Sequence, residues 1–384
     1  MSDIQALGEL VNIAARHTLG PRTCLTRSLL LGWLLRRRGV ESQLRIGVRL
    51  NQGALDAHAW VECCGSAVLG MLCLQAGAGH IDAIDSTAAI EIARQALTKA
   101  GWSEKASFIH GKSFQVELAE LVDVVICDHV GYFGFDYGLI EILADARRSF
   151  LKPGGRLIPG RLRLQLGAVQ SEECHQLAEG WAAPGIPPEF HWLRQHGINT
   201  KYAVNLQADE VLAGPAELAC IDLQVDNPDF FSWSVELTLA RDGTLHGLAG
   251  WFECELAENV WMTNSPLSAQ AIKRPQAFLP IDGPLAVKQG DVISATVMAR
   301  PADHLIAWDV RHPASGRKFS HSTWLGDLLM QEQLAKTRPD HVPQLSRVAR
   351  AKAVVLDYCD GRRSVGQIQA AVLREHPALF PVAR

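Results

Sequence analysis

The chain has 384 residues, 48% of them hydrophobic, and a net charge of −4 at neutral pH. It can form two or three domains, because one domain usually takes roughly 100–200 residues. The acidic balance excludes a general attraction to nucleic acid or anionic lipid, since both need a basic excess. No apolar run approaches the roughly 20 residues that span a bilayer, and the first residues lack a secretory pattern, so we expect a cytoplasmic protein.

The cysteines indicate reduced thiols. There are nine, an odd number, and their scattered positions give neither a disulfide framework nor the spacing of a zinc site. We therefore expect no metal.

A candidate nucleophile starts the first predicted helix. Residues 24–38 have apolar side chains at helical spacing, which places Cys24 in the first turn. Unpaired N–H groups and the positive end of the helix dipole favour a thiolate there. Two strands follow, over 43–50 and 57–63, and the second carries His58, a candidate base. The alternative for Cys24 is a small buried residue at a helix start.

These residues carry a resemblance to a peptidase family. Within residues 10–70, PRTCLTRSLLLGWLLRRRGVESQLRIGV and AHAWVE resemble the transglutaminase-like leader peptidases of lasso-peptide biosynthesis. The resemblance implies a truncated papain-like α+β segment over 1–62, with Cys24 as nucleophile and His58 as base of a Cys-His-Asp triad. The family's acid would fall at Gly70, so this sequence lacks it.

Strands alternate with helices over residues 63–160. A turn at Gly65 leads into an Ala/Leu-rich helix, the strand HIDAID, a helix ended by Gly101, and further strands and a helix. This order predicts an α/β, Rossmann-like domain with a doubly wound parallel sheet. Asp85 ends the second strand, where a carboxylate can accept both ribose hydroxyl hydrogens. The alternative for Asp85 is a helix N-cap.

Three segments between residues 62 and 335 resemble the protein arginine methyltransferases: CGSAVLGMLCLQAGA, VDVVICDHVGYFGFDYGL and RRSFLKPGGRLIPGRLRL. The resemblance implies S-adenosylmethionine as cofactor, a β-barrel after the cofactor domain, and a homodimer as one expected assembly. Only one glycine of the family's glycine loop is kept. The cofactor-binding residues it implies are Glu62, Gly65, Asp85, Ser86 and Asp128.

The acceptor loop departs from this family, which holds a guanidinium between two glutamates. Asp128 matches the first acid, whereas Tyr137 takes the second position and Asp136 stands one residue early. The cations Lys273 and Arg274 fall where the family has Thr-His-Trp, and they would repel a guanidinium. We therefore expect Asp128 and Asp136 as catalytic candidates and an acceptor other than arginine. The alternative for both aspartates is a solvated loop.

The rest of the chain divides into two parts. Residues 161–335 alternate apolar and polar side chains between DG and GD turns, which predicts a β-barrel or sandwich. Residues 336–384 contain a proline-bearing linker and a helix-turn-helix with a basic excess from Arg338 onward. This tail is similar to PqqD-type precursor-peptide binders, which implies an incomplete winged-helix module that docks a leader peptide. The alternative is a solvated basic face.

Three function classes are compatible with these patterns. The first is an S-adenosylmethionine-dependent methyltransferase acting on a peptide or protein, in the biosynthesis of a ribosomally made peptide. The second is a Cys-His thiol peptidase that cleaves a leader from a precursor peptide. The third is a peptide-binding fusion whose two catalytic halves have decayed.

Overall fold

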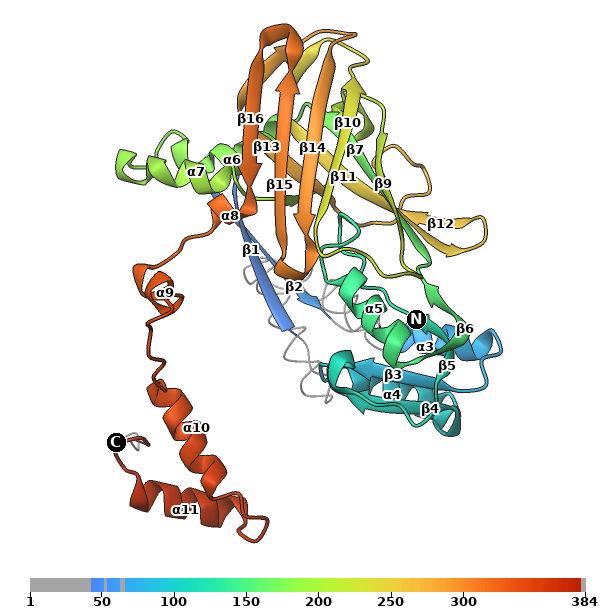
Figure 1. The fold of residues 1–384 in the computed structure, drawn as a ribbon, viewed down its shortest axis with the longest axis vertical. Helices are drawn as coiled ribbons and strands as arrows, with labels where there is room; N and C mark the ends of the chain where they lie inside the picture. Colours follow the sequence, from blue (N-terminus) through green and yellow to red (C-terminus); the bar gives the residue numbers. More distant parts are fainter. Residues whose placement is uncertain (1–42, 52–53, 63–65, 381–384) are drawn as a thin grey trace, which may run out of the picture. The chain divides into compact units, whose positions relative to one another are not determined.

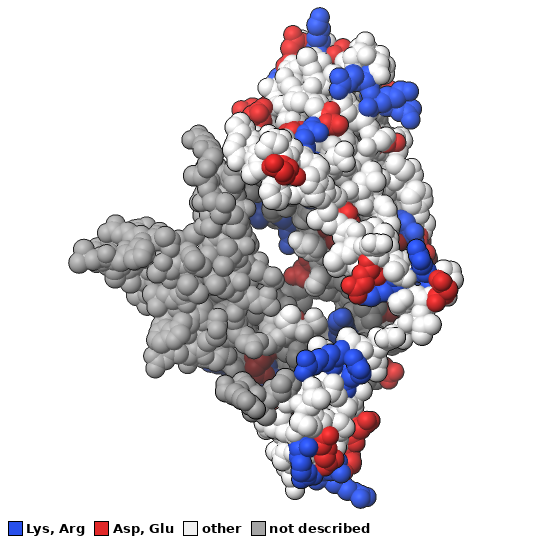
Figure 2. Space-filling view, turned by 90° about the vertical axis from the view of Figure 1, so that its left-hand side faces the viewer, with Lys and Arg blue, Asp and Glu red and all other residues white. Residues whose placement is uncertain are grey.

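The computed structural model describes residues 43–51, 54–62 and 66–380 (Figure 1). The chain divides into two compact units, Met1–Asp327 and Leu328–Arg384. None of the helices in the described ranges is long and apolar enough to cross a membrane. Acidic and basic side chains are interspersed on the face that Figure 2 shows, in keeping with the small net charge.

The described part of the first unit opens with an antiparallel hairpin. Strand β1 (Gln43–Asn51) pairs with β2 (Ala54–Glu62), from Asn51 opposite Ala54 to Gln43 opposite Glu62. The prediction of two strands here is confirmed. Strand β2 begins at Ala54, earlier than the predicted start at residue 57.

A run of alternating helices and strands follows. Its elements are α3 (Ser66–Gln75), β3 (Ile81–Asp85), α4 (Ala89–Lys99), β4 (Ala106–His110), β5 (Val122–Ile126), α5 (Leu139–Ser149) and β6 (Leu151–Ile158). Helix α4 buries Ile90, Ala93 and Leu97, which recur on one helix face. Its end is set by Gly101 at φ 77°, as the sequence predicts.

The parallel strands do not form one sheet in the described ranges. Strand β3 pairs with β4 and β5 pairs with β6, each pair parallel, and no described ladder joins β3 to β5. The single doubly wound sheet is therefore not confirmed. The preceding strand, β2, instead pairs with β1, its neighbour along the chain, which costs little loop entropy. Val124 and Ile126 of β5 remain 46% and 37% exposed.

The following β domain consists of two antiparallel sheets. One runs β8-β13-β11-β7-β9, with β12 on β11, and the other runs β10-β14-β15-β16. Their strands are β7 (Arg161–Val169), β8 (Tyr202–Val204), β9 (Ala216–Asp222), β10 (Phe231–Thr238), β11 (Gly243–Ala257), β12 (Val260–Thr263), β13 (Gln276–Val287), β14 (Val292–Arg300), β15 (Leu305–His312) and β16 (Arg317–Ser322). Both sheets contribute to one core, which includes Leu164, Phe252, Val297 and Trp308. No described ladder closes the sheets into a barrel, so the barrel alternative is corrected to a sandwich.

A helical insertion between β7 and β8 was not predicted. It contains α6 (Glu172–Glu179), η3 (Gly180–Ala182), η4 (Pro188–Leu193) and α7 (Arg194–Gly197). Ser171 caps α6 by accepting the Cys174 N–H at 3.3 Å. A short helix, α8 (Thr323–Gly326), follows the last strand.

The second unit is helical over its described residues, 328–380. It contains α9 (Gln331–Lys336), α10 (Arg347–Asp357) and α11 (Val365–Glu375), with Ser346 and Ser364 as N-caps of the last two. The helix-turn-helix prediction is confirmed. The described residues of this unit include no strand, so the wing of a winged-helix module is not confirmed.

Candidate functional site

Asp136 is anchored inside the loop that follows β5, residues 127–138. Its side chain is 2% exposed and accepts the N–H of Tyr132 at 3.0 Å and the N–H of Phe133. It also forms an ion pair with Lys201, whose side chain is 17% exposed. The carboxylate predicted to be catalytic is thus engaged in fixing the loop.

The same loop is seated on the sandwich. Phe133 packs over Gly250 of β11, where a Cβ atom would lie 2.2 Å from the ring. Asn264, which is fully buried, donates to the Tyr132 carbonyl at 2.8 Å and to the Pro275 carbonyl at 2.6 Å. Glycine is needed at position 250 because the ring occupies the space of a side chain.

Asp128 lies in the exposed part of the loop, with 67% of its side chain accessible. Its Oδ1 is 3.4 Å from His129 Nδ1. This contact lowers the pKa of Asp128, and the positive charge of Arg274 contributes in the same direction. In turn, Asp128 and then Cys127 raise the pKa of His129 to about 10. At neutral pH the loop therefore presents a carboxylate beside an imidazolium.

Asp85 ends β3, as predicted. Its Oδ1 accepts hydrogen bonds from the N–H and the hydroxyl of Thr87, both at 2.7 Å. The N-cap of α4 is Ala88, so Asp85 is not the helix N-cap of the alternative interpretation. Ser86 is exposed, and its carbonyl lies 3.3 Å from His110 Nε2.

The remaining predicted site residues lie in the N-terminal part of the chain, of which the structure describes only the hairpin. Glu62 is the last residue of β2, and Gly65 falls outside the described residues. His58 is on β2 opposite Gly47, which agrees with its predicted strand. Cys24 also lies outside the described residues, so the Cys24–His58 pair stays a prediction.

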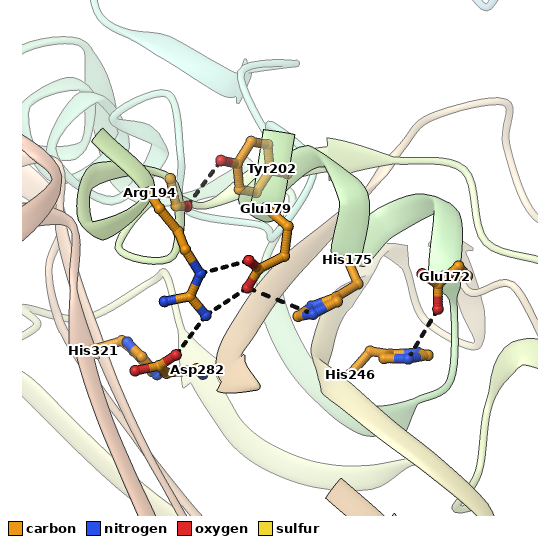
Figure 3. A network of polar contacts seen from close by, with 9 residues as sticks. Glu172, His175, Glu179, Arg194, Tyr202, His246, Asp282 and His321 are labelled. Atoms are coloured by element: carbon orange, nitrogen blue, oxygen red, sulfur yellow. Dashed lines mark hydrogen bonds and ion pairs between the residues drawn. The ribbon is translucent and has the colours of Figure 1, made fainter. Parts of the chain in front are cut away.

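A buried histidine pair was missed by the sequence reasoning (Figure 3). The rings of His175 and His246 stack at 5.1 Å between centroids. Their Nε2 atoms lie 3.7 Å from Glu179 and 3.5 Å from Glu172, respectively. Burial lowers the pKa of both histidines and outweighs the attraction of the two glutamates. The spacing of Glu172, His175 and Glu179 on one face of α6 could have indicated such a cluster.

This network fastens the helical insertion to the sandwich. Arg194 of α7 donates Nη2 to Glu179 at 2.6 Å and to Asp282 of β13 at 2.6 Å. The Asp282 N–H in turn donates to Nε2 of buried His321 at 3.2 Å. Among the described residues no group of three or more His, Cys, Asp or Glu side chains could hold a metal. The network therefore has the geometry of a structural tie.

Comparisons with known proteins match two parts of the chain. Residues 1–78 match the family model of the transglutaminase-like superfamily, and residues 189–311 match that of the arginine methyltransferase oligomerization subdomain. The protein arginine N-methyltransferase 1 of Schizosaccharomyces pombe is 25% identical over 246 residues, which cover 62% of this chain and 72% of that protein. The histone-arginine methyltransferase CARMER of Culex quinquefasciatus is 26% identical over 268 residues, 65% of this chain but only 43% of its own length.

Solved structures show the same fold. The Trypanosoma brucei protein arginine methyltransferase 1 enzyme–prozyme heterotetramer with S-adenosylhomocysteine has a TM-score of 0.59 at 18% identity and covers 68% of this chain and 86% of its own. The Arabidopsis thaliana protein arginine methyltransferase 10 has a TM-score of 0.57 at 18% identity, and the match covers 68% of this chain and 87% of that one. The chain is thus similar to protein arginine methyltransferases over about two thirds of its length and to transglutaminase-like proteins at its N-terminus.

Proposed function

We propose that the chain is an S-adenosylmethionine-dependent methyltransferase that acts on a peptide or protein. The observation that carries the proposal is the Asp85 carboxylate, held at the carboxyl end of a parallel strand in a chain of which an arginine methyltransferase relative matches 62%. In parallel α/β sheets, ligands bind at this end of the strands. The Trypanosoma relative was solved with S-adenosylhomocysteine, the product form of this methyl donor.

The described residues fit the nucleoside part of the cofactor. The two hydrogen bonds from Thr87 fix the orientation of Asp85, which suits the carboxylate to accept ribose hydroxyl hydrogens. Ser86 follows it on the exposed loop, whereas Glu62 and Gly65 stay candidates from the sequence alone. Bound S-adenosylmethionine supplies an electrophilic methyl group, and the acceptor loses a proton when it takes this group.

On the acceptor side, the loop is poorly suited to arginine. Asp128 is already paired with a protonated His129, and Asp136 is engaged by Lys201 and two N–H groups. Tyr137, at the family's second acid position, is 56% exposed and offers a phenol hydroxyl in place of a carboxylate. We therefore propose another peptide nucleophile as the acceptor, in a precursor peptide of a ribosomally made product.

Calorimetric titration with S-adenosylhomocysteine tests the proposal. We expect measurable binding, which Asp85→Ala weakens by at least about tenfold because charge-assisted hydrogen bonds to ribose are lost. Asp85→Asn, which keeps an acceptor oxygen for Thr87, guards against a folding defect. Asp82→Ala on the same strand serves as the matched control and should bind normally.

Two results would contradict the proposal. If the folded wild-type chain does not bind S-adenosylhomocysteine, the proposal that it is a methyltransferase is refuted. Equal affinity of wild type and Asp85→Ala means that the domain does not use its cofactor site as these relatives do. The resemblance would then be one of fold alone, and the catalytically decayed peptide-binding class would replace it.

A second function is favoured by the transglutaminase-like match over residues 1–78. In this alternative Cys24 attacks a peptide bond with His58 as base, and the missing acid slows turnover. Alkylation kinetics at about pH 6 should then show Cys24 reacting faster than exposed Cys359, because only a thiolate–imidazolium pair keeps a thiol ionised there. Equal rates would exclude the pair.

A further inference from the structure

A polar pocket lies on the sandwich domain, on the segment that joins β12 to β13. Its volume is about 340 Å³. Its lining residues are Asn205, Leu206, Ser265, Pro266, Ser268, Ala271, Ile272, Lys273, Arg274 and Gln276. The lining thus combines two cations with hydroxyl and amide groups and contains no carboxylate.

Neither cation has a carboxylate within ion-pair distance in the described part of the chain. Arg274 lies near enough to Asp128 for its charge to lower the pKa of that carboxyl, and Lys273 is exposed. Arg274 donates one Nη1 hydrogen bond to the Gly131 carbonyl at 3.0 Å. That bond orients the guanidinium without cancelling its charge, so the pocket has a local positive potential on a chain of net charge −4.

The neutral groups of the pocket can donate hydrogen bonds. The Ser265 hydroxyl accepts the Leu267 N–H at 3.2 Å, and the Ser268 hydroxyl accepts the Gln270 N–H at 3.2 Å. Both hydroxyls act as acceptors in these bonds, so their hydrogens can still be donated to a ligand. Cations together with hydroxyl donors are the groups that recognise an oxyanion.

The pocket floor is held in place by a buried glutamine. Gln276 Oε1 accepts the Leu206 N–H at 2.9 Å, while Nε2 donates to the Asn264 carbonyl at 2.6 Å. Because these bonds occupy the amide, Gln276 fixes the shape of the pocket and leaves recognition to the other groups. A site fixed in this way loses little conformational entropy when it binds.

The pocket is also tied to the loop that carries Asp128. Arg274 bonds to Gly131 of that loop, and Asn264 bonds both to Tyr132 and to Pro275, beside Arg274. Ligand charge held by Arg274 would therefore lie beside the candidate acceptor site.

We propose that this pocket binds a carboxylate of an acidic peptide and thereby selects acidic substrates for the site next to it. The inference deepens the proposed methyltransferase function, but the binding step itself does not require the cofactor. The chain offers an acidic peptide no general attraction, because its net charge is −4. Selection must come from this local group of donors.

Fluorescence anisotropy with labelled peptides tests the proposal on the full chain without cofactor. We expect a peptide of glutamates spaced by glycine and serine to bind, and its glutamine counterpart to bind at least about tenfold more weakly. The affinity for the glutamate peptide should fall as salt is added, because partly exposed charges are screened.

Variants locate the binding. Lys273→Gln should weaken glutamate-peptide binding about fivefold or more, and Lys273→Glu should abolish it, since both lose a charged donor. Lys318→Gln, an exposed lysine on β16, is the matched control and should bind as wild type. Arg274→Lys, which keeps the charge but not the planar fork, should give an intermediate loss.

Three results would overturn the inference. They are equal affinity for the glutamate and glutamine peptides, equal losses in Lys273→Gln and Lys318→Gln, and tighter binding of a phosphoserine peptide than of the glutamate peptide, which would assign the pocket to phosphate. The two proposals can fail separately. If the chain does not bind S-adenosylhomocysteine but still prefers the glutamate peptide, and this preference depends on Lys273, the proposed function is refuted and the inference on the pocket stands.

Discussion

Asp128 and Asp136 lie in one loop, but the side chain of Asp128 is exposed and that of Asp136 is buried. The sequence indicates two acids beside a predicted strand end, but it does not distinguish them. The distinction depends on Lys201, far along the chain, and on two loop N–H groups that only the folded backbone directs at Asp136. By contrast, the position of Asp85 could be predicted, because a strand end is a local pattern.

We expect Asp136→Ala to destabilise the first unit by about 3–5 kcal/mol, the cost of leaving one member of a buried ion pair alone. Lys201 would lose its partner with only 17% of its side chain exposed. Urea unfolding measures the change. Asp128→Ala is the matched control and should cost no more than about 1 kcal/mol, because it removes only an exposed ion pair with His129. Equal costs for the two variants would show that Asp136 does not anchor the loop.

At the scale of elements, the strands of the sandwich could be predicted and the helical insertion could not. Alternation of apolar and polar side chains identifies strands such as β7 and β10. Helix α6 has only eight residues, and the proline-containing η4 after it interrupts the helical pattern. What holds the insertion is a set of long-range contacts to β11, β13 and β16, which no local pattern contains.

The buried histidines should make this insertion sensitive to acid. Because burial lowers the pKa of His175 and His246 below the ordinary 6.5, the unfolded chain binds more protons than the folded one below that pH. The contribution of these two histidines to the free energy of unfolding should therefore be complete above about pH 6.5 and fall as the pH decreases toward the lowered values. Urea midpoints across pH measure the slope. His246→Phe should flatten it, whereas a change at the exposed His341 should not; a slope unaffected by His246→Phe would contradict this account.

The insertion also exposes large aromatic side chains. Trp181, Phe190 and Trp192 are 45%, 48% and 58% exposed, and residues 189–311 match an oligomerization subdomain. Exposed apolar patches of this kind mark interaction surfaces. We expect the chain to self-associate through them, so Trp192→Glu should shift the mass found by light scattering toward the monomer. Phe230→Glu changes an equally exposed aromatic outside the insertion and should not. The same mass for Trp192→Glu and wild type would place the contact elsewhere.

At the scale of the whole molecule, β2 explains why the architecture could be predicted only in part. Its sequence suits both a hairpin that carries His58 and the first strand of a methyltransferase sheet. The structure pairs it with β1 along its full length, and β5 keeps exposed Val124 and Ile126. Alternation patterns identify a strand but not its partner, because pairing depends on the competition between neighbours in space.

The division into two units predicts where a protease will cut. Lys336 is the exposed last residue of α9, and residues 337–346 between α9 and α10 form neither helix nor strand, which is the kind of backbone that enters a protease site. Limited trypsin digestion should therefore cleave first after Lys336, since the next basic residue, Arg338, precedes a proline and resists cleavage. The fragment ending at Lys336 should keep the unfolding midpoint of the intact first unit, because Met1–Asp327 has its own core. Lys336→Gln should slow this cut, while Lys318→Gln on β16 should leave its rate unchanged, because the backbone of a paired strand is inaccessible to the enzyme. First cleavage within the sandwich, or a lower midpoint for the fragment, would show that the first unit depends on the second for its stability.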